Sequence, residues 1–277
     1  MKKSTIALLA AAGTAAAVSV PVLYDQNRRL RASHYVFQSP KVRGALEGYR
    51  IVQVSDLHNK VYGKGNCELL ALIEAQLPDL IVITGDLMDS YHTNLPKAVE
   101  FARRAAKVAP TFFVTGNHEH RLEKSRLEGF LSDLEDAGVT VLRNKALQMG
   151  MGADHFRLIG VDCQQGKTNT LQSLMENRPK DELNILLSHK PHYAAHYERA
   201  GVDLVLTGHA HGGQWRLPVV GGLYAPGQGV LPKYTAGMYR LDKSVMIVSR
   251  GLGNSSFPIR INNYPELVTV ILRGREE

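Results

Sequence analysis

Residues 50–58 read RIVQVSDLH, and residues 80–89 read LIVITGDLMD. In each stretch an apolar run, typical of a strand buried on both faces, is closely followed by an aspartate. The pattern recurs in residues 111–119 (TFFVTGNHE), 183–189 (LNILLSH) and 202–211 (VDLVLTGHAH), with Asn or His in the polar position. Five predicted strands therefore end in side chains that can bind a metal ion or transfer a proton.

These polar residues are expected to meet in space, because the carboxyl ends of strands in open α/β sheets converge on one crevice. Each motif alone is also typical of a capped turn or of an ordinary histidine at the edge of the core. The occurrence of all five motifs, each after a predicted strand, argues against coincidence. Carboxylate and imidazole ligands suit Mn, Fe or Zn. The candidate ligands are more than one ion needs. Two ions about 3.5–4 Å apart, bridged by a carboxylate, would use them all and leave room for a water nucleophile. The candidate ligands are Asp56, His58, Asp86, Asn117, His189, His209 and His211.

The rest of the chain predicts an α/β protein with two packed sheets and helices outside them. Apolar residues recur at helical spacing in residues 67–76, 96–108 and 122–137, which lie between the first predicted strands. Past Val139 the sequence becomes β-rich, with strands that look antiparallel. We expect residues 49–277 to form one globular domain. Its two cysteines lack CxxC spacing, which excludes a zinc finger or iron–sulfur site and leaves buried thiols or a disulfide pair open.

Composition places the chain among ordinary globular proteins. It has 277 residues, 44% hydrophobic and 21% charged, which excludes wholesale disorder. Of the net charge of +7, residues 1–31 carry +4 (five basic, one acidic), so residues 32–277 carry +3. A nucleic-acid-binding protein is expected to carry a basic stripe on its folded part. The charge distribution therefore argues against nucleic acid as a partner.

The excess charge flanks an apolar segment instead. Residues 4–24 are uncharged, and a helix of that length spans roughly 30 Å, the thickness of the bilayer core. Residues 1–24 are thus expected to be either a single uncleaved anchor in the cell membrane or a cleaved export signal with an Ala15–Ala17 site. We favour the anchor because apolar residues continue to Leu23. Positive charge on both sides leaves the orientation undetermined, and residues 25–48 are expected to hold a polar linker, as far as Ser39, and a first-strand region.

The motifs together resemble the full signature of the calcineurin-like metallophosphoesterases. The resemblance covers about residues 49–211, and its elements are Asp56-Leu-His58, Gly85-Asp86-Leu-Met-Asp89, Gly116-Asn117-His118-Glu119, His189 and Gly208-His209-Ala-His211. It implies a two-sheet αββα sandwich that hydrolyses phosphoesters with a dinuclear centre and a metal-bridging hydroxide. In this family pattern Asp56, His58 and His211 hold one ion, Asn117, His189 and His209 hold the other, and Asp86 bridges them. His118 contacts the substrate and protonates the leaving oxygen or stabilises charge at phosphorus.

The block His211-Gly212-Gly213-Gln214 and the apolar amino terminus more closely resemble a membrane-associated bacterial branch of the family. That branch includes the YkuE- and YaeI-like phosphoesterases and lipid A pathway pyrophosphatases acting on UDP-diacylglucosamine. The resemblance implies a phosphodiester, phosphomonoester or pyrophosphate substrate, small or lipid-linked, at the membrane or envelope. The alternatives are a nuclease of the same fold and a non-catalytic scaffold, and the intact ligand set argues against the scaffold.

Several further residues are candidates for contact with substrate. Asn59 directly follows His58, and His192 shares a helical face with His196. Arg250 and Arg260 follow a predicted strand, where they either grip phosphate at the rim or belong to a structural turn. The flanking Asp89, Glu119 and His120 are expected to orient loops and ligands rather than bind metal. The sequence does not indicate an oligomeric state.

Overall fold

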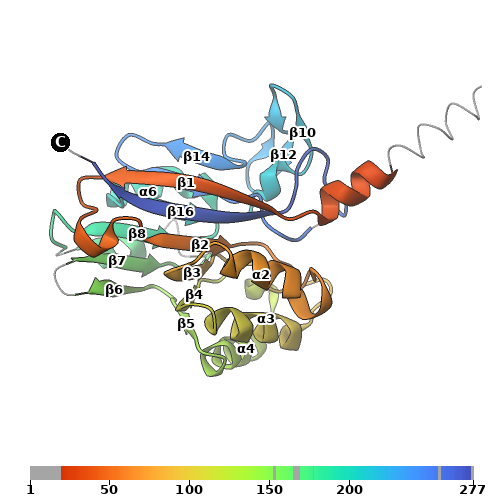
Figure 1. Cartoon of the computed structure of the whole chain (residues 1–277), viewed down its shortest axis with the longest axis horizontal. Helices are drawn as coiled ribbons and strands as arrows, with labels where there is room; N and C mark the ends of the chain where they lie inside the picture. Colours follow the sequence, from red (N-terminus) through yellow and green to blue (C-terminus); the bar gives the residue numbers. More distant parts are fainter. Residues whose placement is uncertain (1–19, 152–153, 165–168, 177, 255–256, 276–277) are drawn as a thin grey trace, which may run out of the picture.

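The computed structural model of the protein describes residues 20–151, 154–164, 169–176, 178–254 and 257–275. Two six-stranded sheets pack face to face, and helices cover their outer faces (Figure 1). In order, the first sheet contains β1 (Arg31–Ser39), β16 (Glu266–Gly274), β2 (Arg50–Val54), β3 (Leu80–Ile83), β4 (Thr111–Phe113) and β5 (Val139–Val141). The second contains β14 (Gly237–Arg240), β15 (Val245–Val248), β9 (Leu204–Thr207), β8 (Leu183–Leu187), β7 (Asp154–Gly160) and β6 (Lys145–Met151). The helices are α2 (Cys67–Glu74), α3 (Leu95–Ala106), α4 (Lys124–Asp136), α5 (Thr170–Met175) and α6 (Ala194–Ala200).

Side chains along each central strand point alternately to the two faces of its sheet, and three apolar layers result. In β3, Leu80 and Val82 face the second sheet, whereas Ile81 and Ile83 face α2, α3 and α4. All four are fully buried, which is why the strand reads as a continuous apolar run. A third layer packs the outer face of the second sheet against α5 and α6. The expected two-sheet α/β architecture is confirmed.

The helices begin where local signals predict. The Asn94 side chain accepts a hydrogen bond from Lys97 N at 3.1 Å, and Pro96 lies in the first turn of α3. Beyond the end of α4, Gly138 has a φ of +87°, the left-handed conformation that stops a helix. The loop after each helix then returns the chain to the start of a parallel strand.

The prediction of antiparallel strands past Val139 is wrong for the centre of the second sheet. Strands β7, β8, β9 and β15 are mutually parallel, and only the edge strands β6 and β14 run antiparallel to their neighbours. The connections from β7 to β8 and from β8 to β9 pass through α5 and α6, six and seven residues long. Helices this short give too few turns for a clear period in the sequence.

The linker expected over residues 25–39 also differs in the structure. Residues 20–28 are helical, and residues 31–39 form β1, which pairs with β16 along its whole length. Its side chains look polar in sequence because β1 is an edge strand with one face partly exposed. Residues 1–19 of the expected apolar segment 1–24 lie outside the described residues. Within the part of the chain that is described, no helix has the length and apolar character needed to cross a membrane. Cys67 and Cys163 are both free thiols, so the disulfide alternative is wrong.

Candidate metal centre

The candidate ligands all follow strands that end on the same side of the sandwich. Asp56, Asp86 and Asn117 follow β2, β3 and β4, and the candidate histidines follow β8 and β9. Backbone hydrogen bonds join these strand ends directly, from Asp56 N to Gly85 O at 3.1 Å and from Gly208 N to His189 O at 3.1 Å. The crevice predicted from the sequence is therefore present, and the two sheets both contribute to it.

Left-handed backbone turns aim the ligand side chains into the crevice. Five ligand residues have φ between +48° and +65°, a region that Asp and His enter more readily than most residues. The close approach of the loops requires glycine as well, since a Cβ on Gly85 would lie 2.5 Å from Gly116 N. Such strain, of order 1–3 kcal/mol per residue, persists where the surrounding structure enforces it, typically at functional sites. The five residues are Asp56, His58, Asp86, His209 and His211.

One ligand group surrounds Asp56. Its Oδ1 lies 3.4 Å from His211 Nε2 and 4.0 Å from His58 Nε2, and the two imidazole nitrogens are 3.3 Å apart. All three side chains are buried. Three ligand atoms within 4.8 Å of one another fit a single metal ion.

A second ligand group surrounds His189. Its Nε2 lies 3.1 Å from His209 Nδ1, 3.1 Å from Asn117 Oδ1 and 3.2 Å from Asp86 Oδ2. The same Asp86 Oδ2 is 3.8 Å from His58 Nε2 in the first group. Asp86 therefore lies between the two groups, the position required of a carboxylate shared by two ions.

The protonation of these residues fits cation binding. Burial lowers the pKa of His58 to about 4 and holds the pKa values of His209 and His211 well below the ordinary value, so these rings are neutral ligands at pH 7. Burial alone would raise the pKa of Asp86, but the nearby imidazoles hold it well below the usual range. Asp86 in turn raises the pKa of His189 to about 9 against the effect of burial, and a metal ion would displace that proton.

Burial also raises the pKa of Asp56 to about 6. Among the described residues, Asp56 and Asp86 form ion pairs only with imidazoles, not with Lys or Arg. Two buried carboxylates need more positive charge than the single protonated imidazole, His189, supplies. The donor set therefore fits a pair of divalent ions.

His118 lies beside both groups but is held by other partners. Ser90 N donates to its Nδ1 at 3.1 Å. Nε2 faces Arg121, 3.4 Å away, and the open cavity. Burial lowers the pKa of His118, and Asp89, whose Oδ1 lies 3.3 Å from Nδ1, acts in the opposite direction. Asp89, expected to orient a loop, thus contacts the proposed acid directly.

Glu119 ties the loops of the two ligand strands together. Its fully buried carboxylate accepts hydrogen bonds from Gly116 N at 2.7 Å and from Asp86 N and Leu87 N at 2.9 Å. The supporting role expected for Glu119 agrees with these contacts. His120 instead turns away and pairs with Asp162 outside the crevice.

We expect Glu119→Ala to lower the free energy of unfolding by about 3 kcal/mol or more, because each buried donor left without an acceptor costs ~1–3 kcal/mol. Urea unfolding of the metal-free protein measures this loss. Glu135→Ala, on the exposed face of α4, is the matched control and is expected to be nearly neutral. Equal unfolding midpoints for the two variants would contradict the proposed support.

A cavity of about 550 Å³ opens over the ligands. Lys190 and Arg121 bring positive charge to its wall, and Tyr224, Pro226 and Phe257 form an apolar side. Neither cation was singled out in the sequence, although each lies close to a motif histidine. Positive charge beside two metal sites is suited to phosphate oxygens.

The candidate substrate contacts occupy different places. His192 lines the cavity, with its ring 5.8 Å from that of His209. Asn59 is not part of the cavity wall and donates to His92 O at 3.2 Å. Arg250 is also outside the wall, with its Nε 3.7 Å from Glu266 Oε1.

Arg260 is not a rim residue but a fully buried support. Its guanidinium donates to Asn254 Oδ1 and Arg250 O, both at 2.9 Å, and to Gly253 O, and burial lowers its pKa to about 10. The loop that it holds donates from Gly253 N to Asp56 O at 2.6 Å. Arg260 thus fixes the backbone around a candidate ligand, a role that no local sequence signal indicates.

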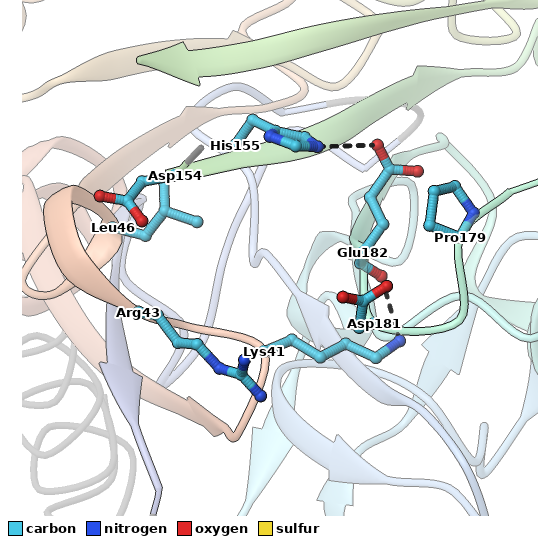
Figure 2. A pocket seen from close by; sticks show the side chains of 8 residues that line it. All are labelled: Lys41, Arg43, Leu46, Asp154, His155, Pro179, Asp181 and Glu182. Atoms are coloured by element: carbon cyan, nitrogen blue, oxygen red, sulfur yellow. Dashed lines mark hydrogen bonds and ion pairs between the residues drawn. The ribbon is translucent and has the colours of Figure 1, made fainter. Parts of the chain in front are cut away.

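A second cavity, of about 300 Å³, lies at the opposite end of the sandwich, beside the starts of β7 and β8 (Figure 2). Lys41 bridges Asp203 Oδ1 at 2.8 Å and Glu182 O at 3.1 Å, and His155 Nε2 lies 3.8 Å from Glu182 Oε1. No group of three metal-ligating side chains was found there among the described residues. These contacts hold the segment after β1 against the second sheet and indicate a structural role.

Comparison with known proteins places the chain in a family. The family model of the calcineurin-like phosphoesterases matches residues 49–213. The chain belongs to this family and is a metallophosphoesterase, a hydrolase of phosphoester bonds, with a centre suited to two divalent ions.

Individual relatives extend the likeness over most of the chain. It is 31% identical to the phosphodiesterase YaeI of Escherichia coli, over 81% of this chain and 82% of that protein. It is 30% identical to the uncharacterized metallophosphoesterase YkuE of Bacillus subtilis, over 91% of this chain and 88% of that protein. A transmembrane protein with metallophosphoesterase domain from Danio rerio is 28% identical over 84% of this chain, and the match spans 55% of that protein's length.

Proposed function

We propose that this protein hydrolyses phosphoesters with two ions that share Asp86. The observation that carries the proposal is the position of Asp86 Oδ2, 3.8 Å from His58 Nε2 and 3.2 Å from His189 Nε2. Mn, Fe and Zn all suit this donor set. Asp56, His58 and His211 would hold one ion, and Asn117, His189 and His209 the other.

Hydrolysis builds negative charge on the phosphoryl oxygens while the attacking and leaving oxygens lie in line. Two divalent ions, when bound by these residues, would supply Lewis acidity and lower the pKa of a water that serves as the nucleophile. Lys190 and Arg121 hold the phosphoryl group from the cavity wall. His118 in its charged form would donate the Nε2 proton to the leaving oxygen and become neutral, and Asp89 beside Nδ1 stabilises the charged form.

The substrate is proposed to be a membrane- or envelope-associated phosphodiester, phosphomonoester or pyrophosphate. The similarity to the phosphodiesterase YaeI supports a diester, and UDP-diacylglucosamine is a candidate pyrophosphate. Residues 1–24 would place the enzyme at the membrane as a single anchor or export it as a cleaved signal, and the name of the Danio rerio relative supports a membrane location. His192 would contact substrate within the cavity, whereas Asn59 and Arg250 would do so only with a substrate that extends beyond it.

The test is hydrolysis of a bis-aryl phosphodiester and an aryl phosphomonoester by the full chain. Activity is measured after chelation and again after Mn, Fe or Zn is restored. We expect loss on chelation and recovery with at least one metal, and the substrate ratio then distinguishes diesterase from monoesterase. A folded protein that binds no divalent ion would overturn the proposal.

A further inference from the structure

An unusual concentration of exposed apolar side chains lies beside the cavity. Two small hairpins, β10–β11 (Arg216–Leu217 and Gly221–Gly222) and β12–β13 (Tyr224–Ala225 and Gly229–Val230), follow the last candidate ligand. Val219 is fully exposed, Val230 is 77% exposed and Leu231 is 64% exposed. Exposed apolar patches of this kind mark surfaces that bind membranes or proteins. We call this surface the apolar rim and define it as Trp215, Leu217, Val219, Val220, Val230 and Leu231.

Backbone conformation makes two of these residues more unusual. Val219 has a φ of +68° and Leu231 a φ of +53°, where Asn or Gly would be less strained. An asparagine at an exposed position would also make the protein more soluble than a valine or leucine does. Solubility and backbone preference therefore both disfavour the residues that are present, which indicates that the apolar side chains have a use outside the folded core.

The apolar rim is continuous with the amino-terminal helix. Asn262 N donates to Gln26 Oε1 at 2.8 Å, and Asn262 Nδ2 donates to Arg216 O at 3.2 Å. This bridge holds residues 20–28 at the same end of the molecule as β10 and β12, as Figure 1 shows. On that helix Val20, Val22 and Tyr24 are exposed, and the preceding residues 4–19 contain no charged residue.

Charge around the apolar rim favours an anionic surface. No Asp or Glu occurs in residues 215–231, which contain the apolar rim, whereas Arg216 lies within this stretch and the exposed Lys233 just after it. Arg28 at the end of helix 20–28 and Arg29 directly after it add two more bases, of which Arg29 pairs with Asp25. Apolar side chains with nearby bases are the combination that binds interfaces containing anionic lipids.

We propose that the apolar rim docks on a lipid bilayer containing anionic phospholipids and turns the cavity toward the headgroups. Tyr224 lies between rim residues in sequence, and the ring of Phe257 is 5.3 Å from that of Trp215 and 5.9 Å from that of Tyr224. Tyr224 and Phe257 also line the cavity, so the cavity wall and the rim adjoin. A phosphoester in a lipid headgroup could thus reach the ligands while its apolar part stays near the bilayer. The inference of a docking surface depends only on the exposed loops and does not require the proposed hydrolysis. Only the choice of a lipid-linked substrate rests on the proposed function.

The single tryptophan provides the test, because Trp215 belongs to the apolar rim. The full chain is mixed with vesicles of phosphatidylglycerol and phosphatidylethanolamine, with and without bromine on the acyl chains. We expect brominated chains to quench Trp215 and its emission to shift to shorter wavelength. Insertion of the amino-terminal segment alone would not bring Trp215 into contact with acyl chains.

The variant is Val219→Asn combined with Leu231→Asn, which suits the left-handed backbone and is expected to unfold at the wild-type temperature or higher. We expect each substitution to shift the docking equilibrium about tenfold toward the undocked state, since each removes most of a buried side chain's transfer free energy. The matched control is Leu77→Asn, an exposed leucine with φ of +51° before β3, at the opposite end of the sheet. It should leave the quenching unchanged.

Two results would overturn the docking proposal. One is Trp215 emission that is identical in brominated and unbrominated vesicles, and the other is a double variant quenched as strongly as the wild type. The double variant is expected to hydrolyse a water-soluble aryl phosphodiester normally. Absent quenching with normal hydrolysis would therefore refute docking alone, whereas quenching without any hydrolysis would refute the proposed function alone.

Discussion

Asp86→Asn is expected to abolish hydrolysis, with a loss on the order of 10³-fold or more, since Lewis-acid stabilisation is worth several kcal/mol. The amide keeps the size of the side chain and can still accept the hydrogen bond from His118 N, 2.7 Å from Oδ1 in the wild type. It removes the negative charge that lies between the two ligand groups. Both ions should therefore bind more weakly, and metal content should fall together with activity.

The measurements for Asp86→Asn are steady-state hydrolysis and metal content by elemental analysis. Asp203→Asn is the matched control, because Asp203 pairs with Lys41 at the opposite end of the sandwich. That variant should keep both activity and metal, with at most a modest loss of stability. An Asp86→Asn protein that retains two ions and wild-type turnover would refute the shared-carboxylate assignment.

His118→Ala is expected to keep its metal but to lose about 10²–10⁴-fold in kcat, the usual contribution of general acid catalysis. The candidate ligand groups around Asp56 and His189 remain intact, since His118 is held by Ser90 and Asp89. The loss should be larger for an alkyl phosphoester than for an aryl one, because an alkoxide leaving group needs a proton more. This dependence on the leaving group separates acid catalysis from simple positioning.

The kinetic comparison uses both substrates with metal content measured in parallel. His196→Ala is the control, because His196 on α6 contacts Arg199 and does not line the cavity. It should leave kcat unchanged for both substrates. If His118→Ala lost activity equally for both leaving groups, transfer of a proton from His118 would be wrong.

The strands that carry the candidate ligands could be predicted because two requirements coincide in them. Burial on both faces makes β3 a continuous apolar run and leaves a single internal polar residue in each of β2 and β8. The turns after β2 and β3 place Asp56 and Asp86 in left-handed conformations. Such runs are short, distinctive and local. The convergence of Asp56, Asp86 and His189 then follows from the geometry of parallel strands alone.

Features that depend on distant partners could not be predicted in this way. β1 is recognisable only through its pairing with β16, which is far away in sequence. Arg260 resembles any surface arginine until the carbonyls of Arg250 and Gly253 are brought around it. The charges of Lys190 and Arg121 gain meaning only from the cavity that they share.

The place of β16 between β1 and β2 has a consequence for the order in which the protein matures. Ser33 and Glu266, hydrogen-bonded across this pairing, are 233 positions apart. A nascent chain that has released every candidate ligand from the ribosome still lacks the strand that covers β2, and an open edge attracts other strands. It also lacks a stable loop at Leu252 and Gly253, which bond to the backbone beside Asp56. The ribosome must therefore have passed β16 before the centre can be completed, so shorter nascent chains are expected to need protection from aggregation and to lack activity.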